Sequence, residues 1–353
     1  MTAAASHKTL PGSAIAEHVV CDPWAAPLSI SVIVPVLNGG EIFRECLRSL
    51  RALSPAPDEI IVVEDGGTDG SGLVAEELGA QVLRLAENGG PARARNAGAR
   101  VARGSLLVFF DADVAVHPDA LGQIRAAFAN EPALAALFGS YDDAPAAPNF
   151  LSQYRNLMHH FVHQSSREQA STFWSGCGAI RREIFFQMRG FDERYRRPSI
   201  EDIELGYRMT RAGHPIRLCK TLLVKHHKEW RTASMLQADL SLRAVPWTEL
   251  ILRDGRFVND LNLRSSSRAS VVLAYLALGF PALGFLAAEV WPLALALACV
   301  LAMLVCNRPL IAFFWRKRGP LFALGALPWL FLFQLYSGLG FALGLWRHLN
   351  RRG

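Results

Sequence analysis

Pairs of acidic residues follow two apolar runs of the chain. Glu64 and Asp65 come directly after EIIVV. Asp111 comes directly after SLLVFF, and Asp113 follows two residues later. Carboxylate oxygens are the ligands that hard divalent cations prefer, and such a cation bridges protein carboxylates to phosphate oxygens. Asp111 and Asp113 are two residues apart, so their side chains share one side of an extended chain. The pattern favours a metal-assisted phosphate site, and the alternative is that the Asp pair caps the following helix.

Alternating strands and helices must position these carboxylates. Apolar runs rich in β-branched residues predict strands at 29–36, 59–63, 80–85 and 105–110. Helical spacing and turn signals predict helices at 41–53, 92–103 and 199–212. This alternation is expected of an α/β fold with a doubly wound sheet, in which ligands bind beyond the carboxyl ends of the strands. Further strands are expected near 173–180 and 216–224, and an excursion from the sheet at 141–171.

Four motifs follow one another in a fixed order. They are SVIVPVLN, VEDGGTDGS, GPARARN and FDAD, which begin at residues 31, 63, 90 and 110. In this order they resemble the family 2 inverting glycosyltransferases, which have the GT-A fold. The resemblance extends over about 29–231 and implies a mixed sheet with a Rossmann-like nucleotide-binding half. It also implies sugar transfer from a nucleotide-diphosphate sugar, with inversion and with Mn²⁺ or Mg²⁺ as the cofactor.

The resemblance implies roles for the donor-side residues. Asp113 corresponds to the metal ligand, and Asp111 to a residue that faces the nucleotide, the donor sugar and the metal. Asp65 corresponds to the residue that binds the nucleobase. The other implied nucleotide-sugar contacts are Pro35, Asn38, Glu64, Arg93 and Arg95. An ordinary turn at residues 64–65 and solvated arginines are the alternatives.

Downstream segments resemble the catalytic and acceptor side of the same family. The segment SIEDIEL implies that Asp202 is the general base toward the acceptor hydroxyl, with Glu201 supporting it. A displacement of this kind needs a proton acceptor opposite the leaving phosphate. A helix start with Ser199 as the N-cap and Asp202 at N3 is the structural alternative, and it is compatible with the role of a base. The segment WSGCG implies acceptor contacts for Trp174 and Gly176, and a structural tryptophan is the alternative.

Two groups of histidines are candidate metal ligands. Either His226 or His227, at the end of an apolar strand, is expected to complete the metal shell or to contact the diphosphate, because imidazole is a plausible ligand beside a carboxylate. His159 and His163 have the i, i+4 spacing of helical metal sites. They lack the glutamate of a zincin pattern, so an acceptor-side or surface role is favoured for them.

The C-terminal part of the chain is almost free of charge. Between residues 271 and 346 the charged residues are Glu289, Arg308, Arg316, Lys317 and Arg318. Apolar segments at 271–287, 290–306 and 320–346 predict two or three transmembrane helices. If the N-terminal part of the chain is cytoplasmic, three spans would place the basic C-terminus outside, against the positive-inside rule. An interfacial or re-entrant first or second segment would remove that conflict.

A helix between the head and this tail is predicted to be amphipathic. Leu236, Leu240, Ala244 and Trp247 are spaced along one face, which favours a membrane-surface helix with Trp247 at headgroup depth. A helix packed on the catalytic domain is the alternative. We therefore expect a leader at 1–28, a catalytic domain at 29–231, a connector at 232–268 and a membrane domain at 269–353.

Composition narrows the class of protein and its location. The net charge is +6, but the basic residues form no stripe with interleaved aromatics, so nucleic acid is not the expected partner. Many of them flank the tail, where anionic headgroups would attract them. These residues are Arg253, Arg256, Arg264, Arg268, Arg316, Lys317, Arg318, Arg347, Arg351 and Arg352. The six cysteines have no C-x-x-C spacing, which favours free thiols in a reducing compartment. The first 27 residues lack the apolar region of a secretory signal.

The sequence thus favours a multi-pass protein of the cytoplasmic (inner) membrane with its catalytic domain in the cytoplasm. Its expected reaction is sugar transfer to a lipid or lipid-linked acceptor. A non-catalytic nucleotide-binding membrane scaffold and a synthase that feeds a polysaccharide are the alternatives. A nicotinamide-dependent oxidoreductase is excluded, because no G-x-G-x-x-G follows the first strand.

Overall fold

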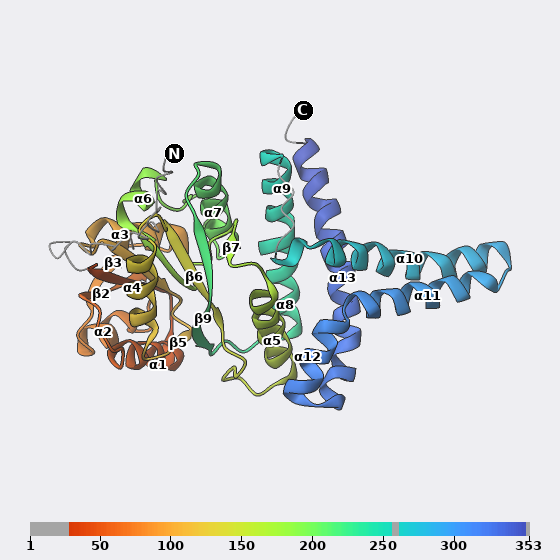
Figure 1. The fold of residues 1–353 in the computed structure, drawn as a ribbon, viewed down its shortest axis with the longest axis horizontal. Coiled ribbons are helices and arrows are strands. Elements are labelled where there is room, and N and C mark those ends of the chain that lie inside the picture. The colour runs from red at the N-terminus through yellow and green to blue at the C-terminus, as the bar shows by residue number, and fades with distance from the viewer. Residues whose placement is uncertain (1–27, 256–260, 351–353) are drawn as a thin grey trace, which may run out of the picture.

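A mixed β-sheet forms the centre of the N-terminal part of the protein (Figure 1). The computed structural model describes residues 28–255 and 261–350. Within them the strand order is β3-β2-β1-β4-β8-β6-β9-β5, with β7 beside β9. The strands are β1 (Ile30–Val36), β2 (Glu59–Asp65), β3 (Gln81–Leu85), β4 (Leu106–Phe110), β5 (Val114–Val116), β6 (Ala136–Tyr141), β7 (Gln169–Ala170), β8 (Cys177–Arg181) and β9 (Ile216–His226).

Helices cover both faces of this sheet. They are α1 (Gly40–Arg51), α2 (Ser71–Glu77), α3 (Pro91–Val101), α4 (Ala120–Asn130), α5 (Phe150–Ser165), α6 (Arg182–Gln187) and α7 (Glu201–Arg211). Successive residues of β1 point to opposite faces, so Val32 packs in the core that contains Phe43 of α1, and Ile33 in the core that contains Ala94 of α3. Burial on both faces explains why β1 is a continuous apolar run.

The first half of the sheet is parallel and the second half is mixed. Strands β1 to β4 pair in parallel, as the alternation of strands and helices predicts. Strand β8 is antiparallel to both β4 and β6, whereas β6 is parallel to β9. Strand β6 is not among the predicted strands, and its last residue, Tyr141, is the first residue of the expected excursion. That excursion contains helix α5, which packs against β6.

Helix α7 begins differently from the expectation. Its first residue is Glu201, preceded by Ile200, and it has no side-chain cap. The Ser199 hydroxyl donates instead to the carbonyl oxygen of Leu242, 2.6 Å away. The prediction of Ser199 as the N-cap was therefore wrong, and Ser199 joins the loop before α7 to a later helical segment.

A series of helices follows residue 231. They are α8 (Thr232–Gln237), the π-helical segment η1 (Ala238–Ala244), α9 (Val245–Asp254), the 3₁₀ turn η2 (Leu261–Leu263), α10 (Ser265–Ala287), α11 (Trp291–Cys306), α12 (Arg308–Arg318) and α13 (Pro320–Asn350). Among the described residues, two helices, α10 and α13, are long and apolar enough to cross a membrane, and the bent pair α11–α12 would be a third candidate if it forms one span. Helices α10 and α11 form a hairpin that projects from the rest of the protein (Figure 1).

Residues 28–231, the head, are in direct contact with the helices that follow. Trp247 was expected at headgroup depth, but its indole N–H donates to the Tyr207 hydroxyl of α7, 3.1 Å away. On other sides of the same helical stretch, Ala244 lies against Gly340 and Thr248 against Gly344 of α13. The stretch 232–254 therefore packs between α7 and α13.

Several basic residues assigned to headgroups contact protein instead. Arg253 pairs with Glu204, Arg264 donates to the hydroxyls of Ser165 and Ser166, and Lys317 pairs with Asp143. Arg318 donates to Gln153 and to the backbone of residue 143. The expected leader, Cys21, Arg256, Arg351 and Arg352 lie outside the described residues. Cys46, Cys177, Cys219, Cys299 and Cys306 are free thiols.

Candidate active site

The carboxyl end of β4 brings Asp113 to a histidine. Asp113 lies between β4 and β5, and β5 pairs with the end of β9, where Val114 is opposite His226. The Asp113 Oδ2 atom is 3.7 Å from His226 Nε2. The backbone N–H of His227 donates to the carbonyl oxygen of Asp113, and no partner is present for the buried His227 Nε2 among the described residues. Of the two candidate histidines, His226 therefore faces the carboxylate.

A tyrosine that was not predicted fixes the His226 ring. Tyr141 ends β6, and its ring stacks on His226 with centroids 4.0 Å apart and planes 16° from parallel. Burial and the charges of Asp113 and Asp111 raise the pKa of Tyr141 well above its usual value, so its hydroxyl stays neutral. The signal in the sequence that could have placed Tyr141 at a strand end is the apolar run that it closes, which resembles the predicted strands.

The pair Asp113–His226 fits a divalent cation by the chemistry of its donor atoms. Burial raises the pKa of Asp113, but the nearby His226 imidazole and the charge of Lys228 outweigh burial and hold the pKa at about 2. The carboxylate is thus ionised at neutral pH. Among the residues that the structure describes, no group of three or more His, Cys, Asp or Glu side chains is placed to enclose a metal. A cation held here would keep open positions for oxygen atoms of a ligand.

Arg95 joins Asp111, which follows β4, to Glu201, which begins α7. Its Nη2 donates to Asp111 Oδ1 (2.6 Å) and its Nη1 donates to Glu201 Oε1 (2.9 Å). The Arg95 side chain is only 5% exposed, so the guanidinium is engaged inside the protein. Arg95 was predicted as a nucleotide-sugar contact, with a solvated surface arginine as the alternative. The structure places it instead between Asp111 at the end of β4 and Glu201 at the start of α7.

Asp202 is held by backbone and hydroxyl donors in a position beside Glu201. Its Oδ2 accepts from the Ser175 backbone N–H (3.0 Å) and hydroxyl (3.2 Å), and its Oδ1 accepts from the Ile203 N–H (2.8 Å). Burial, followed by the negative charge of Glu201, raises the pKa of Asp202 from 3.8 to about 6. A carboxyl group with this pKa is able to take up a proton near neutral pH. Ser175 was not singled out, although it lies in the WSGCG motif.

Trp174 and Gly176 lie between Asp111 and an aromatic cluster. A Cβ atom on Gly176 would stand 2.6 Å from the Trp174 ring and 2.9 Å from Asp111 Oδ2, so only glycine allows this approach. The Trp174 ring centroid is 4.9 Å from that of Tyr141 and 5.1 Å from that of His159. The acceptor-side residues predicted from the motif are therefore next to the predicted metal ligands.

The histidines of α5 belong to this aromatic cluster. The His159 and His163 ring centroids are 4.1 Å apart. Burial lowers the pKa of His163 to about 4, and burial together with nearby positive charges lowers that of His159 well below its usual value. Both rings are therefore neutral at pH 7, and they form part of no metal-binding group among the described residues.

The donor-side residues after β1 and β2 hold turns of the chain. Asp65 accepts from the backbone N–H groups of Gly89 (2.9 Å) and Gly90 (2.8 Å), before helix α3. Glu64 accepts from the N–H of Gly72, and the Asn38 side-chain oxygen accepts from that of Thr68. Pro35 lies in β1 opposite Val63. These contacts place the residues at the carboxyl edge of the parallel strands, as predicted, and show that each has a structural task there.

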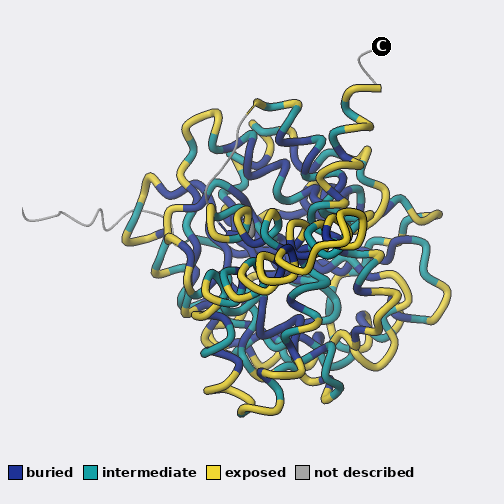
Figure 2. Tube along the Cα trace, turned by 90° about the vertical axis from the view of Figure 1, so that its right-hand side faces the viewer, coloured by how far each residue is buried: buried dark blue, intermediate teal, exposed yellow. Residues whose placement is uncertain are grey.

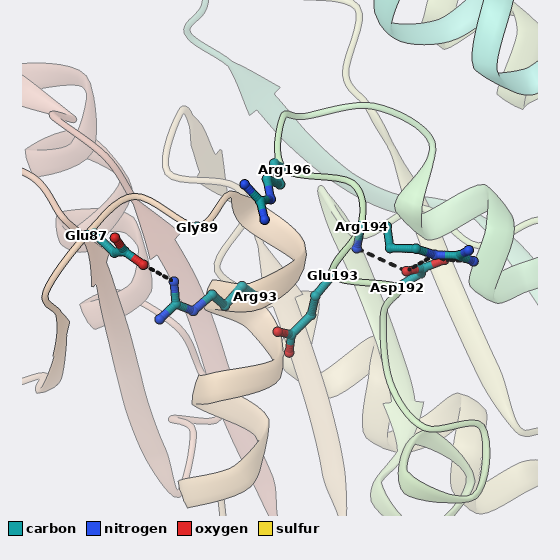
Figure 3. A pocket seen from close by; sticks show the side chains of 7 residues that line it. All are labelled: Glu87, Gly89, Arg93, Asp192, Glu193, Arg194 and Arg196. Atoms are coloured by element: carbon teal, nitrogen blue, oxygen red, sulfur yellow. Dashed lines mark hydrogen bonds and ion pairs between the residues drawn. The ribbon is translucent and has the colours of Figure 1, made fainter.

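A hollow of about 730 Å³ lies beside the turn that Asp65 holds. Figure 3 shows its lining, which comes from the start of α3 and from the loop before α7. The lining residues are Glu87, Gly89, Arg93, Asp192, Glu193, Arg194 and Arg196. Arg93 lies across it toward Glu87, at 3.3 Å, and Arg194 pairs with Asp192 (Figure 3). Arg93 thus borders an open space, in contrast to the enclosed Arg95.

Comparison with known proteins identifies the domain. Residues 31–188 match the protein-family model described as Glycosyl transferase family 2. The chain carries a family 2 glycosyltransferase domain. The matched residues contain β1 except its first residue, β2 to β4, both Asp residues after β4, and the Trp174–Gly176 loop.

Curated relatives match this glycosyltransferase domain over short stretches. The uncharacterized glycosyltransferase YibD of Escherichia coli (strain K12) is 40% identical over 93 residues, which are 25% of this chain and 27% of that protein. The succinoglycan biosynthesis protein ExoU of Rhizobium meliloti (strain 1021) is 33% identical over 105 residues, which are 28% of this chain and 30% of that protein. The chain thus spans less than a third of the length of either relative.

A solved structure shares the fold over most of its length. The mannosyltransferase PcManGT from Pyrobaculum calidifontis, in complex with GDP-Man and Mn²⁺, has a TM-score of 0.57 at 19% sequence identity. The match covers 90% of this chain and 87% of that chain. The predicted fold, a mixed GT-A-type sheet followed by C-terminal helices, is confirmed.

Proposed function

We propose that this protein transfers a sugar from a nucleotide-diphosphate sugar, with inversion, to a lipid or lipid-linked acceptor at the cytoplasmic face of the membrane. The observation that carries the proposal is the link through Arg95, which joins Asp111, near the Asp113–His226 pair, to Glu201, beside Asp202. The side with Asp111, Asp113 and His226 suits a diphosphate with its cation, and Asp202 on the other side supplies a proton acceptor. The complex of PcManGT with GDP-Man and Mn²⁺ supports the donor class.

In this reaction the residues of the chain have separate tasks. Asp113 and His226, with Asp111 close by, would hold Mn²⁺ or Mg²⁺, which when bound neutralises charge on the leaving diphosphate. Asp202 accepts the proton of the acceptor hydroxyl as the hydroxyl oxygen attacks the sugar carbon. Trp174 provides a flat apolar face beside Gly176 for the acceptor. Asp65 and Arg93, at the hollow next to α3, remain the proposed contacts of the nucleotide.

The C-terminal helices support an acceptor at the membrane. Helices α10 and α13 are long and apolar enough to cross a bilayer, and α12 and α13 pack directly on α5, which carries His159 of the aromatic cluster. The active site is thereby joined to the apolar part of the protein. A synthase that feeds a polysaccharide is the main alternative, and it is favoured by the name of the relative ExoU.

Turnover of nucleotide sugars in the presence of Mn²⁺ or Mg²⁺ tests the proposal. We expect Asp113→Ala to abolish metal-dependent turnover, while Asp119→Ala, an exposed carboxylate before α4, leaves it unchanged. Product extracted with membrane lipids supports a lipid acceptor, and product retained as a polymer overturns that part. Failure of the whole chain to turn over any nucleotide sugar would overturn the proposed enzyme activity, and binding without turnover would favour the non-catalytic scaffold.

A further inference from the structure

The α10–α11 hairpin is joined to the rest of the protein at its base. The Tyr275 hydroxyl of α10 donates to the carbonyl oxygen of Leu335 in α13, 2.7 Å away. Asn307, at the end of α11, donates to the Ser270 hydroxyl near the start of α10 (2.9 Å). Beyond this base the two helices run together past α13 and end in the turn at Ala288 (Figure 1).

The hairpin beyond its base exposes apolar side chains. At the tip, Phe285 is 87% exposed and Val290 is 78% exposed, and Figure 2 shows exposed residues on the side of the protein from which the hairpin projects. Between Arg268 and Arg308, Glu289 at the tip is the one charged residue. The 16 residues of α11 are about 24 Å long, shorter than the roughly 30 Å hydrocarbon core of a typical bilayer, and local thinning of the bilayer accommodates such a difference. Water is a poor solvent for such a surface, and a lipid bilayer is a good one.

Helix α13 has a different environment, because one of its faces is attached to the head and connector along much of its length. Ala323 and Leu330 are buried in the cluster that contains Tyr154 of α5. Farther along, the Tyr336 hydroxyl donates to Asp239 Oδ2 of η1 (2.7 Å), and Asp239 also pairs with Arg155 of α5. A helix held in this way cannot lie within the hydrocarbon core without taking these charged groups with it.

The opposite face of α13 is apolar and exposed. It includes Leu321, Leu324, Leu339, Leu343, Trp346 and Leu349. Figure 1 shows α13 running across the base of the hairpin rather than beside its arms. A helix that is attached to protein on one side and exposes apolar side chains on the other suits the surface of a membrane.

We propose that α10 and α11 are the two membrane-crossing helices, and that α13 lies in the plane of the membrane surface between the head and the lipid. The head and the C-terminus then lie on the same side of the membrane, and the tip at Glu289 on the other. Arg268 lies in the first turn of α10, Arg308 and Arg316 lie in α12 after the end of α11, and the short turn at the tip contains no Lys or Arg. The positive-inside rule therefore places the base in the cytoplasm. This topology does not depend on the proposed reaction.

Cysteine labelling in sealed vesicles of each orientation tests the topology. Single cysteines are introduced as Glu77→Cys in the head, Glu289→Cys at the tip and Asn350→Cys at the end of α13, all at exposed positions. The background is the full chain with its native cysteines replaced by serine, and an impermeant maleimide is the probe. We expect positions 77 and 350 to react from one side and position 289 from the other. Reaction of positions 77 and 350 from opposite sides, or of 289 from the side of the head, would overturn the proposal.

A matched pair of arginine substitutions tests the same topology by a second route. Leu339→Arg and Leu297→Arg change one exposed leucine in the middle part of α13 and of α11, respectively. We expect Leu339→Arg to leave the amount of membrane-integrated protein unchanged, because an arginine at the membrane surface reaches the headgroups. We expect Leu297→Arg to reduce it several-fold. Equal losses in both variants would show that α13 also crosses the hydrocarbon core.

Discussion

The substitution Glu201→Gln is expected to move the pH dependence of sugar transfer. Burial and then the charge of Glu201 raise the pKa of Asp202 from 3.8 to about 6, a rise of about two units. A base acts in its ionised form, so activity should increase as the pH rises through about 6 and then level off. Removing the Glu201 charge lowers the pKa of Asp202. It also leaves the positive charge of Arg95 less neutralised, which lowers that pKa further.

Both effects have the same sign, so the acid limb of the profile should move to lower pH. Glu201 is the second of the two principal causes of a two-unit rise, and we expect a shift of about one pH unit. At a pH one unit below the original midpoint, the ionised fraction of Asp202 then rises from about one tenth to about one half.

The assay is kcat/KM for the acceptor, measured from about pH 5 to pH 8 at saturating metal and donor. Glu204→Gln is the matched control, because Glu204 is also buried on α7 and ion-paired, but its partners are Arg208 and Arg253 rather than Arg95. We expect its midpoint to stay at that of the unmodified protein. A profile of Glu201→Gln that moves upward, or that moves no more than the control, would refute the assignment of Asp202 as the titrating base.

Three further predictions concern the metal ligand, the glycine of the acceptor loop and the attachment of the connector. His226→Ala should weaken activation by Mn²⁺ by about 10-fold or more, the order of effect of a lost metal contact, whereas His227→Ala should change this activation little. Titration of activity with Mn²⁺ measures both variants, and equal effects would contradict the choice of His226. Gly176→Ala should lower kcat by about 10-fold or more, because its Cβ would press on Trp174 and Asp111, while Gly122→Ala, in a roomier helical site, should slightly raise thermal stability. Asp239→Ala should lower the free energy of unfolding by about 3–5 kcal/mol, because it leaves a buried arginine unpaired; a loss below about 1 kcal/mol in detergent-solubilised protein would mean that the contact adds little.

The parallel half of the fold was predictable because its signals are local. Strands β1 to β4 lie within two residues of their expected bounds, since each is a β-branched or apolar run closed by turn residues. The positions of Asp65, Asp111 and Asp113 at strand ends follow directly from those bounds. The helical segments after residue 264 were predictable for the same reason, because long apolar runs have few other structures available.

The contacts between distant elements were not predictable from the sequence. Arg95 was equally compatible with either face of α3, and its burial depends on Asp111 and Glu201, 16 and 106 residues away. The choice of His226 depends on the antiparallel pairing of β5 with β9, and on the ring of Tyr141 from a third strand. Helix α13 is apolar on both faces, so its composition alone could not separate a face that binds protein from one that meets lipid.

The ion pair between Arg155 and Asp239, with the Tyr336 hydroxyl beside it, has a consequence for the reach of the enzyme. It fixes α13 to α5 without a flexible linker, so the aromatic cluster at His159 is held at a constant height above the helix that we place at the lipid surface. The distance between the active site and the lipid surface is therefore fixed. For the lipid or lipid-linked acceptor proposed above, this fixed height would favour molecules whose reactive hydroxyl extends to it over molecules whose hydroxyl lies nearer to the lipid or farther from it.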